Sequence, residues 1–335
     1  MSQLNINTIR DASGGNNAVL YGVAAPSNSM GFRNRIINGD MRIDQRNNGA
    51  SVINATNYIV DRWADFKAGS GGYTAQRSTT APVGFTNSFQ HTVTTAVSPA
   101  AGDVYQIIQP IEGYNTADLG FGTASAQAVT VSFWVRSSVT GLYSIFLYNS
   151  AGNRSYVATY SIAVANTWEQ KSITIAGDTS GTWLTDNGLG ISLGFDLGSG
   201  SNQNTTAGAW QAGAFRRTSG CVNWISTNGA TFYITGVQLE AGTVATPFER
   251  RDYGRELMMC QRYFARFNAL TSTTARVGTN VLPVQMRASP TVAAAFDSGT
   301  GATYTTLSGV PGTGLFQDTA HSVTATANIT VTAEL

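Results

Sequence analysis

The chain has 335 residues, of which 42% are hydrophobic, 10% aromatic and only 12% charged. This hydrophobic fraction is enough for a sizeable core and argues against a disordered chain, and the lack of a long apolar run argues against a membrane span. Lys and Arg together number 20 and Asp and Glu 19, so the net charge is +1, which is too small for the phosphate attraction that nucleic-acid binding needs. We therefore expect neither a nucleic-acid partner nor membrane insertion.

The first 32 residues are rich in Asn, Gly and Ser and hold one short alternating piece with Leu4, Ile6 and Ile9. Such a piece pairs as a strand only if a partner supplies the sheet. We interpret residues 1–32 as an attachment arm; the alternative is a frayed terminus. The start shows no basic segment followed by an apolar stretch, so we expect no secretory signal and synthesis in a cytoplasm.

Residues 33–250 consist of short runs of period-two alternation separated by Gly, Ser and Asn turns. The clearest run places Leu189, Ile191, Leu193, Phe195 and Leu197 on one face. Similar runs lie at 89–93, 129–135, 143–147, 156–162 and 232–234. So many short strands predict an all-β fold, with two antiparallel sheets joined as a jelly-roll sandwich.

One connecting helix is predicted over 251–266, because Tyr253, Leu257 and Phe264 recur at helical spacing after Asp252, a suitable N-cap. Residues 267–335 return to strand patterns, at 277–286, at 291–296 and in a last strand that ends near Ala333. The last strand has one lightly apolar face and one threonine face. We expect this small C-terminal β domain to complete its core against identical copies.

Catalytic constellations are hard to assemble from this sequence. The chain has two histidines, His91 and His321, and two cysteines, Cys221 and Cys260, which fit neither a triad nor a zinc site. We interpret His91 as a core histidine and both cysteines as small buried side chains. No two carboxylates have a spacing that suits a glycosidase, so we expect caps and solvated acids and no enzymatic activity.

Aromatic residues in polar loops give a better functional signal, because sugar rings stack on aromatic faces while amides and Arg bind their hydroxyls. The loop 198–220 carries Trp210, Phe215 and Arg216, and a second turn-rich segment carries Trp183 and Asn187. We predict these five residues as glycan contacts. The alternative is that they close the end of the sandwich or pack against a neighbouring subunit. The remaining tryptophans lie in or beside strands and are predicted to be core: Trp63, Trp134, Trp168 and Trp224.

Three stretches carry a family resemblance: RNRIINGDMRIDQR at 33–46, the Asp61-Arg62-Trp63 triplet, and VQLEAGTVATPFERRDYGRELMMCQRYF at 237–264. With the segment at 282–290 and the final Ala-Glu-Leu, they resemble bacteriophage tail-fibre and related virion proteins. In those proteins an N-terminal arm precedes a jelly roll similar to carbohydrate-binding modules. The resemblance implies a trimeric, sugar-directed adhesin in the phage tail. Its arm would bind tail, baseplate or adaptor proteins, and its jelly roll a host cell-surface glycan.

In the related modules, a strand near an Asn-Gly-Asp motif and the last strand meet at a structural calcium. Asn38-Gly39-Asp40 matches the first part, but Thr235 stands near where an aspartate belongs. We therefore expect no metal and no cofactor. Two other functions stay open: a purely structural collar, baseplate or head-decoration protein, and a polysaccharide depolymerase.

Overall fold

The computed structural model describes residues 32–54, 56–268, 277–281, 284–288, 290–296, 315–319 and 327–335, together with a short hairpin of β1 (Val19–Leu20) and β2 (Val23–Ala24). Leu4, Ile6 and Ile9 of the predicted attachment arm lie outside the described residues. In the described part no helix is long and apolar enough to cross a membrane.

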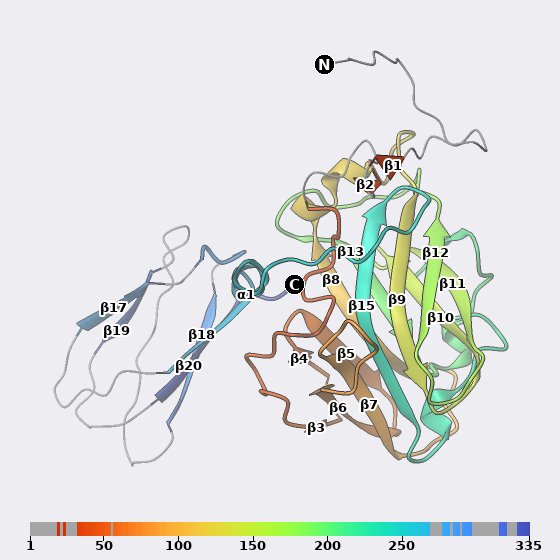
Figure 1. Ribbon diagram of the computed structural model, residues 1–335, viewed down its shortest axis with the longest axis horizontal. Helices are drawn as coiled ribbons and strands as arrows, with labels where there is room; N and C mark the ends of the chain where they lie inside the picture. The colour runs from red at the N-terminus through yellow and green to blue at the C-terminus, as the bar shows by residue number, and fades with distance from the viewer. Residues whose placement is uncertain are drawn as a thin grey trace.

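The main body is a sandwich of two antiparallel sheets (Figure 1). The first sheet has seven strands in the order β14 (Trp210–Ala212), β11 (Arg154–Ile162), β10 (Gly141–Tyr148), β13 (Leu189–Asp196), β8 (Val104–Glu112), β5 (Trp63–Ala68) and β4 (Tyr58–Val60). The second has six, in the order β12 (Glu169–Ile175), β9 (Val129–Ser137), β15 (Thr231–Ala241), β7 (Ser88–Thr95), β6 (Gly72–Ser78) and β3 (Val52–Ile53). Short 3-10 turns occur at Gly113–Asn115, Ala117–Leu119, Ser201–Gln203 and Trp224–Ser226. The predicted jelly-roll β-sandwich is thus confirmed.

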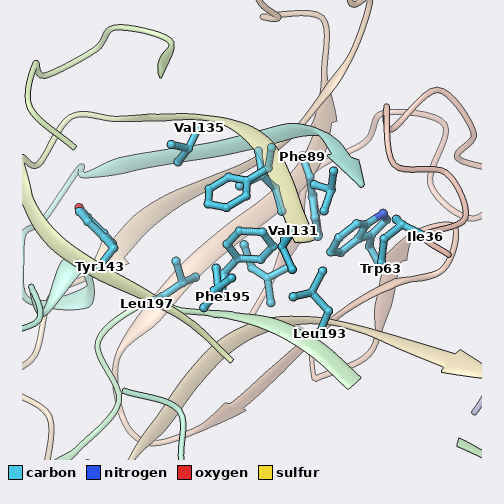
Figure 2. Close-up of a cluster of buried hydrophobic side chains, with 14 of the residues drawn as sticks. Ile36, Trp63, Phe89, Val131, Val135, Tyr143, Leu193, Phe195 and Leu197 are labelled. Atoms are coloured by element: carbon cyan, nitrogen blue, oxygen red, sulfur yellow. The ribbon is translucent and has the colours of Figure 1, made fainter. Parts of the chain in front are cut away.

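The core lies between the two sheets and follows the predicted alternation. Ile191, Leu193 and Phe195 of β13 are at most 1% exposed, and Trp63 and Phe195 lie in ring contact at 6.4 Å (Figure 2). Burying one such side chain stabilises a fold by roughly 1.5–3 kcal/mol. Trp63 and Trp224 are fully buried, which confirms two of the four predicted core tryptophans.

Close packing on the outer face of the seven-stranded sheet explains why β13 has a glycine at position 194. Gly194 pairs with Phe146 of β10, whose ring lies across it. A Cβ atom on Gly194 would lie 2.1 Å from Cζ of Phe146. The glycine is therefore needed for close packing, since its side of β13 has no room for a side chain.

The helix α1 (Tyr253–Gln261) begins after Asp252, which accepts a hydrogen bond from the backbone N–H of Arg255 at 2.9 Å. It is shorter than the predicted 251–266, because Phe264 already belongs to strand β16 (Phe264–Asn268). That strand pairs with β20 (Ala327–Thr332), which pairs in turn with β18 (Thr291–Phe296). Another pair joins β17 (Val277–Val281) to β19 (Leu315–Thr319). The domain boundaries at 32, 250 and 266 stay predictions.

Buried ion pairs join the C-terminus to segments from the first part of the chain. They lie at one end of the sandwich, which we call the base. Glu334 forms ion pairs with Arg46 and with Arg62, and Arg62 lies over the ring of Tyr263 at 3.6 Å. The hydroxyl of Tyr263 donates to Glu112, and burial raises the pKa of this tyrosine. The stretches that carried the family resemblance thus meet in one ionic cluster, although they lie far apart in the sequence.

The opposite end of the sandwich, which we call the free end, holds the turns before β8 and β15 and the loop after β13. β15 runs from the free end, at Thr231, to the base, at Ala241, beside β9 along its length (Figure 1).

Candidate functional site

Two of the predicted glycan contacts lie in an aromatic cluster near the base. Trp183, Trp210 and Phe121 meet edge to face, with the two indole centroids 5.4 Å apart. Each indole N–H donates to a backbone carbonyl, of Ser180 from Trp183 at 3.1 Å and of Ala176 from Trp210 at 2.7 Å. Trp183 is only 8% exposed, so its ring offers no free face, and Trp210 is half-buried above it.

The other three predicted contacts lie elsewhere. Arg216 crosses the outer face of the seven-stranded sheet and donates from Nε to Gln106 at 2.6 Å, and burial lowers its pKa. Phe215 is half-buried against Gly213 on the same loop. Asn187 lies at the base, where its side-chain amide donates to the carbonyl of Arg287 at 3.1 Å. The structure therefore does not bring the five residues together into one exposed site.

Trp134 and Trp168 correct the sequence prediction, because neither is in the core. Trp134 alternates on β9 with the buried Phe133 and Val135, so it points outward from the six-stranded sheet and is half-buried. Trp168 precedes β12 and is half-buried on the same face. The alternation of β9 already held this signal, since a residue between two core residues faces away from the core.

On this face, one line of side chains near the free end runs from the residue before β12 across the four strands β9, β15, β7 and β6, and we call it the aromatic row. Arg136 of β9 pairs with Tyr233 of β15, which pairs with Gln90 of β7, which pairs with Gln76 of β6. Trp168 completes the row beyond Arg136, because the next residue, Glu169, pairs with Val135. Four strand spacings of about 4.8 Å give a length of roughly 19 Å, which suits a short oligosaccharide better than a single ring.

The side chains of the aromatic row keep polar groups free for a ligand. Trp168 packs edge to face on Tyr233 at 6.0 Å, and the guanidinium of Arg136 lies 5.1 Å from the centre of the same ring. Tyr233 is only 8% exposed beneath them, so the ring of the half-buried Trp168 is the one in the row that can stack on a sugar. Arg136 donates from Nε to the carbonyl of Asn166 at 2.9 Å, and its two terminal nitrogens have no protein partner among the described residues. Gln90 and Gln76 are half-exposed beside them, and Nε2 of Gln90 donates to Oγ1 of Thr92 at 3.3 Å.

The residues on either side of the aromatic row are also polar or aromatic. On one side Gln170 of β12 is exposed and pairs with Trp134. On the other side three half-exposed threonines stand in register on neighbouring strands: Thr74, Thr92 and Thr231. No carboxylate stands in these rows.

A loop closes the row toward the base. Phe85 packs over Gly236, whose φ is +60° and where a Cβ would lie 2.6 Å from Cζ of Phe85 and 3.1 Å from Trp134. Phe248 meets Phe85 edge to face at 5.3 Å, and Arg250 lies over the Phe85 ring. The open part of the sheet face is therefore the half next to the free end.

The carboxylates described between residues 32 and 266 all have protein partners, either cations, polar side chains or backbone N–H groups. Asp65 and His91, on opposite sheets, illustrate this. Both are fully buried, and Nε2 of His91 lies 2.9 Å from Oδ1 of Asp65, whose pKa is raised by burial. His91 is thus the predicted core histidine, and Cys221 and Cys260 are buried as predicted.

The Asn-Gly-Asp motif serves the fold. Asn38 donates to the carbonyls of Ile43 and Asp61, and Asp40 forms an ion pair with Arg42 at 2.5 Å. Thr235 donates to the carbonyl of Asn87. Among the described residues, no group of three or more His, Cys, Asp or Glu side chains is placed to hold a metal ion.

No protein-family model matches this sequence, and no curated protein gives a significant match. Solved structures with a similar fold include the enzymatically active domain of tailspike protein 4 of bacteriophage CBA120, at 16% identity and a TM-score of 0.34 over 62% of this chain. This chain spans only 21% of that tailspike chain.

Two more are a family 11 carbohydrate-binding module of Clostridium thermocellum and the N-terminal cellulose-binding domain of Cellulomonas fimi β-1,4-glucanase C. The first has 11% identity and a TM-score of 0.31 over 58% of this chain and 98% of its own. The second has 13% identity and a TM-score of 0.29 over 52% and 90%.

Proposed function

We propose that this chain is a non-enzymatic glycan-binding protein of a phage tail, and that the aromatic row binds a neutral host-surface oligosaccharide. The observation that carries the proposal is the sheet face where the half-buried Trp168 and Arg136 pack around the buried ring of Tyr233 and lie beside the half-exposed amides of Gln90 and Gln76. Aromatic faces stack on sugar rings, and amides and guanidinium groups bind hydroxyls.

The chemistry of this face favours a neutral ligand that is bound and not cleaved. Arg136 is the one charged side chain of the aromatic row, and its guanidinium already contacts the Tyr233 ring. Glycoside hydrolysis needs two carboxylates across the scissile bond, and no carboxylate stands in the row.

The position of the row supports a role in attachment. The arm at 1–32 leads into Arg33 and Asn34, which contact the segment 247–249 and the half of β15 next to the base. The row lies on the half of the sandwich next to the free end. A chain fixed to a virion through its arm would then present the row away from the attachment point.

Copies displayed together would strengthen weak binding. We propose a homotrimer, in line with the resemblance to tail fibres. Several linked sites raise avidity by about 10²–10⁴-fold without any new contact. This gain in avidity would allow a shallow, open site with weak affinity to hold a particle on a host surface.

The decisive experiment measures binding of the purified chain to a panel of bacterial surface glycans. Trp168→Ala should weaken the strongest binding by roughly 30-fold, because loss of an aromatic stacking contact costs about 2 kcal/mol. Gln90→Ala should weaken it by about fivefold, since one hydrogen bond contributes about 1 kcal/mol. Tyr114→Ala is the matched control, because Tyr114 is 63% exposed but lies near the base.

Two outcomes would contradict the proposal. One is unchanged glycan binding by Trp168→Ala with circular dichroism like that of the unmodified chain. The other is loss of binding in Trp210→Ala alone, which would move the site to the loop that the sequence predicted.

A further inference from the structure

A polar cleft of about 290 Å³ opens at the free end, between the loop after β13 and the loop before β15. Its floor is formed by Ser199, Gly200, Arg217 and Cys221, which are at most 8% exposed. It is separate from the aromatic row, whose residues do not line it.

Buried charges hold the walls of the cleft in place. Arg217 is 5% exposed and donates to the carbonyl of Cys221 at 2.6 Å, to Oδ1 of Asn223 at 2.7 Å and to the carbonyl of Ser199. Its Nε lies 3.6 Å from Oδ2 of Asp196, which also accepts from the backbone N–H groups of Gly198 and Ser199. The cleft is therefore set by the folded loops before any ligand arrives.

The rim of the cleft offers neutral polar groups. Ser201, Ser219 and Asn223 are exposed there, and the Nδ2 group of Asn223 has no protein partner among the described residues. The one cation, Arg217, is already paired with Asp196. A ligand that both donates and accepts hydrogen bonds without carrying charge matches this rim.

We propose that this cleft is a second binding site, which takes one neutral polyhydroxylated ring such as the terminal unit of a glycan. Its volume lies at the lower limit of small-molecule pockets, which span about 300–1,000 Å³, so it accepts one ring and not a chain. The site does not depend on the aromatic row, and each can bind sugar without the other.

Saturation-transfer NMR tests the proposal with the methyl glycosides of glucose, galactose, mannose and N-acetylglucosamine. The full chain carries Trp168→Ala, so that the aromatic row contributes little signal. At least one glycoside should show saturable transfer, which Ser219→Trp abolishes by filling the cleft mouth. Ser125→Trp is the control, since Ser125 is exposed on a loop at the other end of the sandwich.

The thiol of Cys221 gives an independent readout from the cleft floor. The bound glycoside should slow its alkylation by iodoacetamide, and Ser201→Ala with Ser219→Ala should raise the half-protecting concentration roughly fivefold for each hydrogen bond lost. Cys260 is the internal control, because it is 1% exposed and burial raises its pKa.

The proposal fails if no glycoside shows saturable transfer, or if Ser219→Trp leaves the transfer unchanged. Stronger protection of Cys221 by glucuronate than by every neutral glycoside would also overturn it, because it would mark an anion site. Binding of Trp168→Ala to the panel of bacterial surface glycans tests the aromatic row separately, so the two proposals can fail independently.

Discussion

Replacing Glu334 by Gln is the strongest test of the ionic cluster at the base. The side chains of Glu334 and Arg62 are 6% and 1% exposed, and Arg46 also pairs with Glu334 at 2.8 Å. The amide leaves Arg62 as a buried cation without a counter-ion. Removing one partner of a buried pair costs about 3–5 kcal/mol, mostly from the charge left behind.

This cost converts to a measurable shift in thermal unfolding. An unfolding entropy of about 2.1 cal/mol/K per residue gives about 0.7 kcal/mol/K for a chain of this length, so Tm should fall by roughly 4–7 °C. Differential scanning calorimetry at neutral pH measures it. Asp118→Asn is the control, because Asp118 is 56% exposed in its pair with Arg35 and such pairs contribute about 0–1 kcal/mol. Equal shifts for the two variants would refute the reasoning.

Three further variants test other parts of the fold. Burial raises the pKa of Asp61 from 3.8 to about 6, so ionisation of this carboxyl should lower the free energy of unfolding by about 3 kcal/mol as pH rises from 4 to 6. Urea unfolding measured across this pH range should show a smaller fall for Asp61→Asn, and an equal fall in both proteins would reject this reasoning. Gly194→Ala should lower the urea midpoint by the equivalent of about 1–3 kcal/mol, because Cβ meets the Phe146 ring, whereas Gly102→Ala, with open space around it, should not. Asp252→Ala should cost about 1 kcal/mol through loss of the helix cap, and no change in the unfolding midpoint would count against that cap.

The sequence predicted the strands well, because alternation in a half-buried strand directly reports which face meets the core. Leu193 and Phe195 are examples, and their burial follows the predicted pattern. The same rule, applied to Trp134 between Phe133 and Val135, would have placed that tryptophan outside. Tryptophan is highly buried on average, but the core prediction for Trp134, which follows residue type, is wrong.

The candidate sites depend on contacts that no local pattern carries. The aromatic row joins residues from β9, β15, β7 and β6, and its register exists only once the sheet has formed. The ion pair of Arg62 with Glu334 joins positions 272 residues apart. The loop residues Trp183 and Trp210 were sensible glycan candidates by composition, but their N–H groups bind backbone carbonyls inside an aromatic cluster.

The base also determines how a mechanical load would pass through the molecule. Arg33 donates to the carbonyl of Pro247 at 2.8 Å, and Arg251 donates to the carbonyl of Ile36 at 3.1 Å. The segments that lead into and out of the sandwich are therefore bonded directly to each other. Tension between them acts on these short links and bypasses the sheets, so the sandwich can keep its binding surfaces undistorted while the base bears the force.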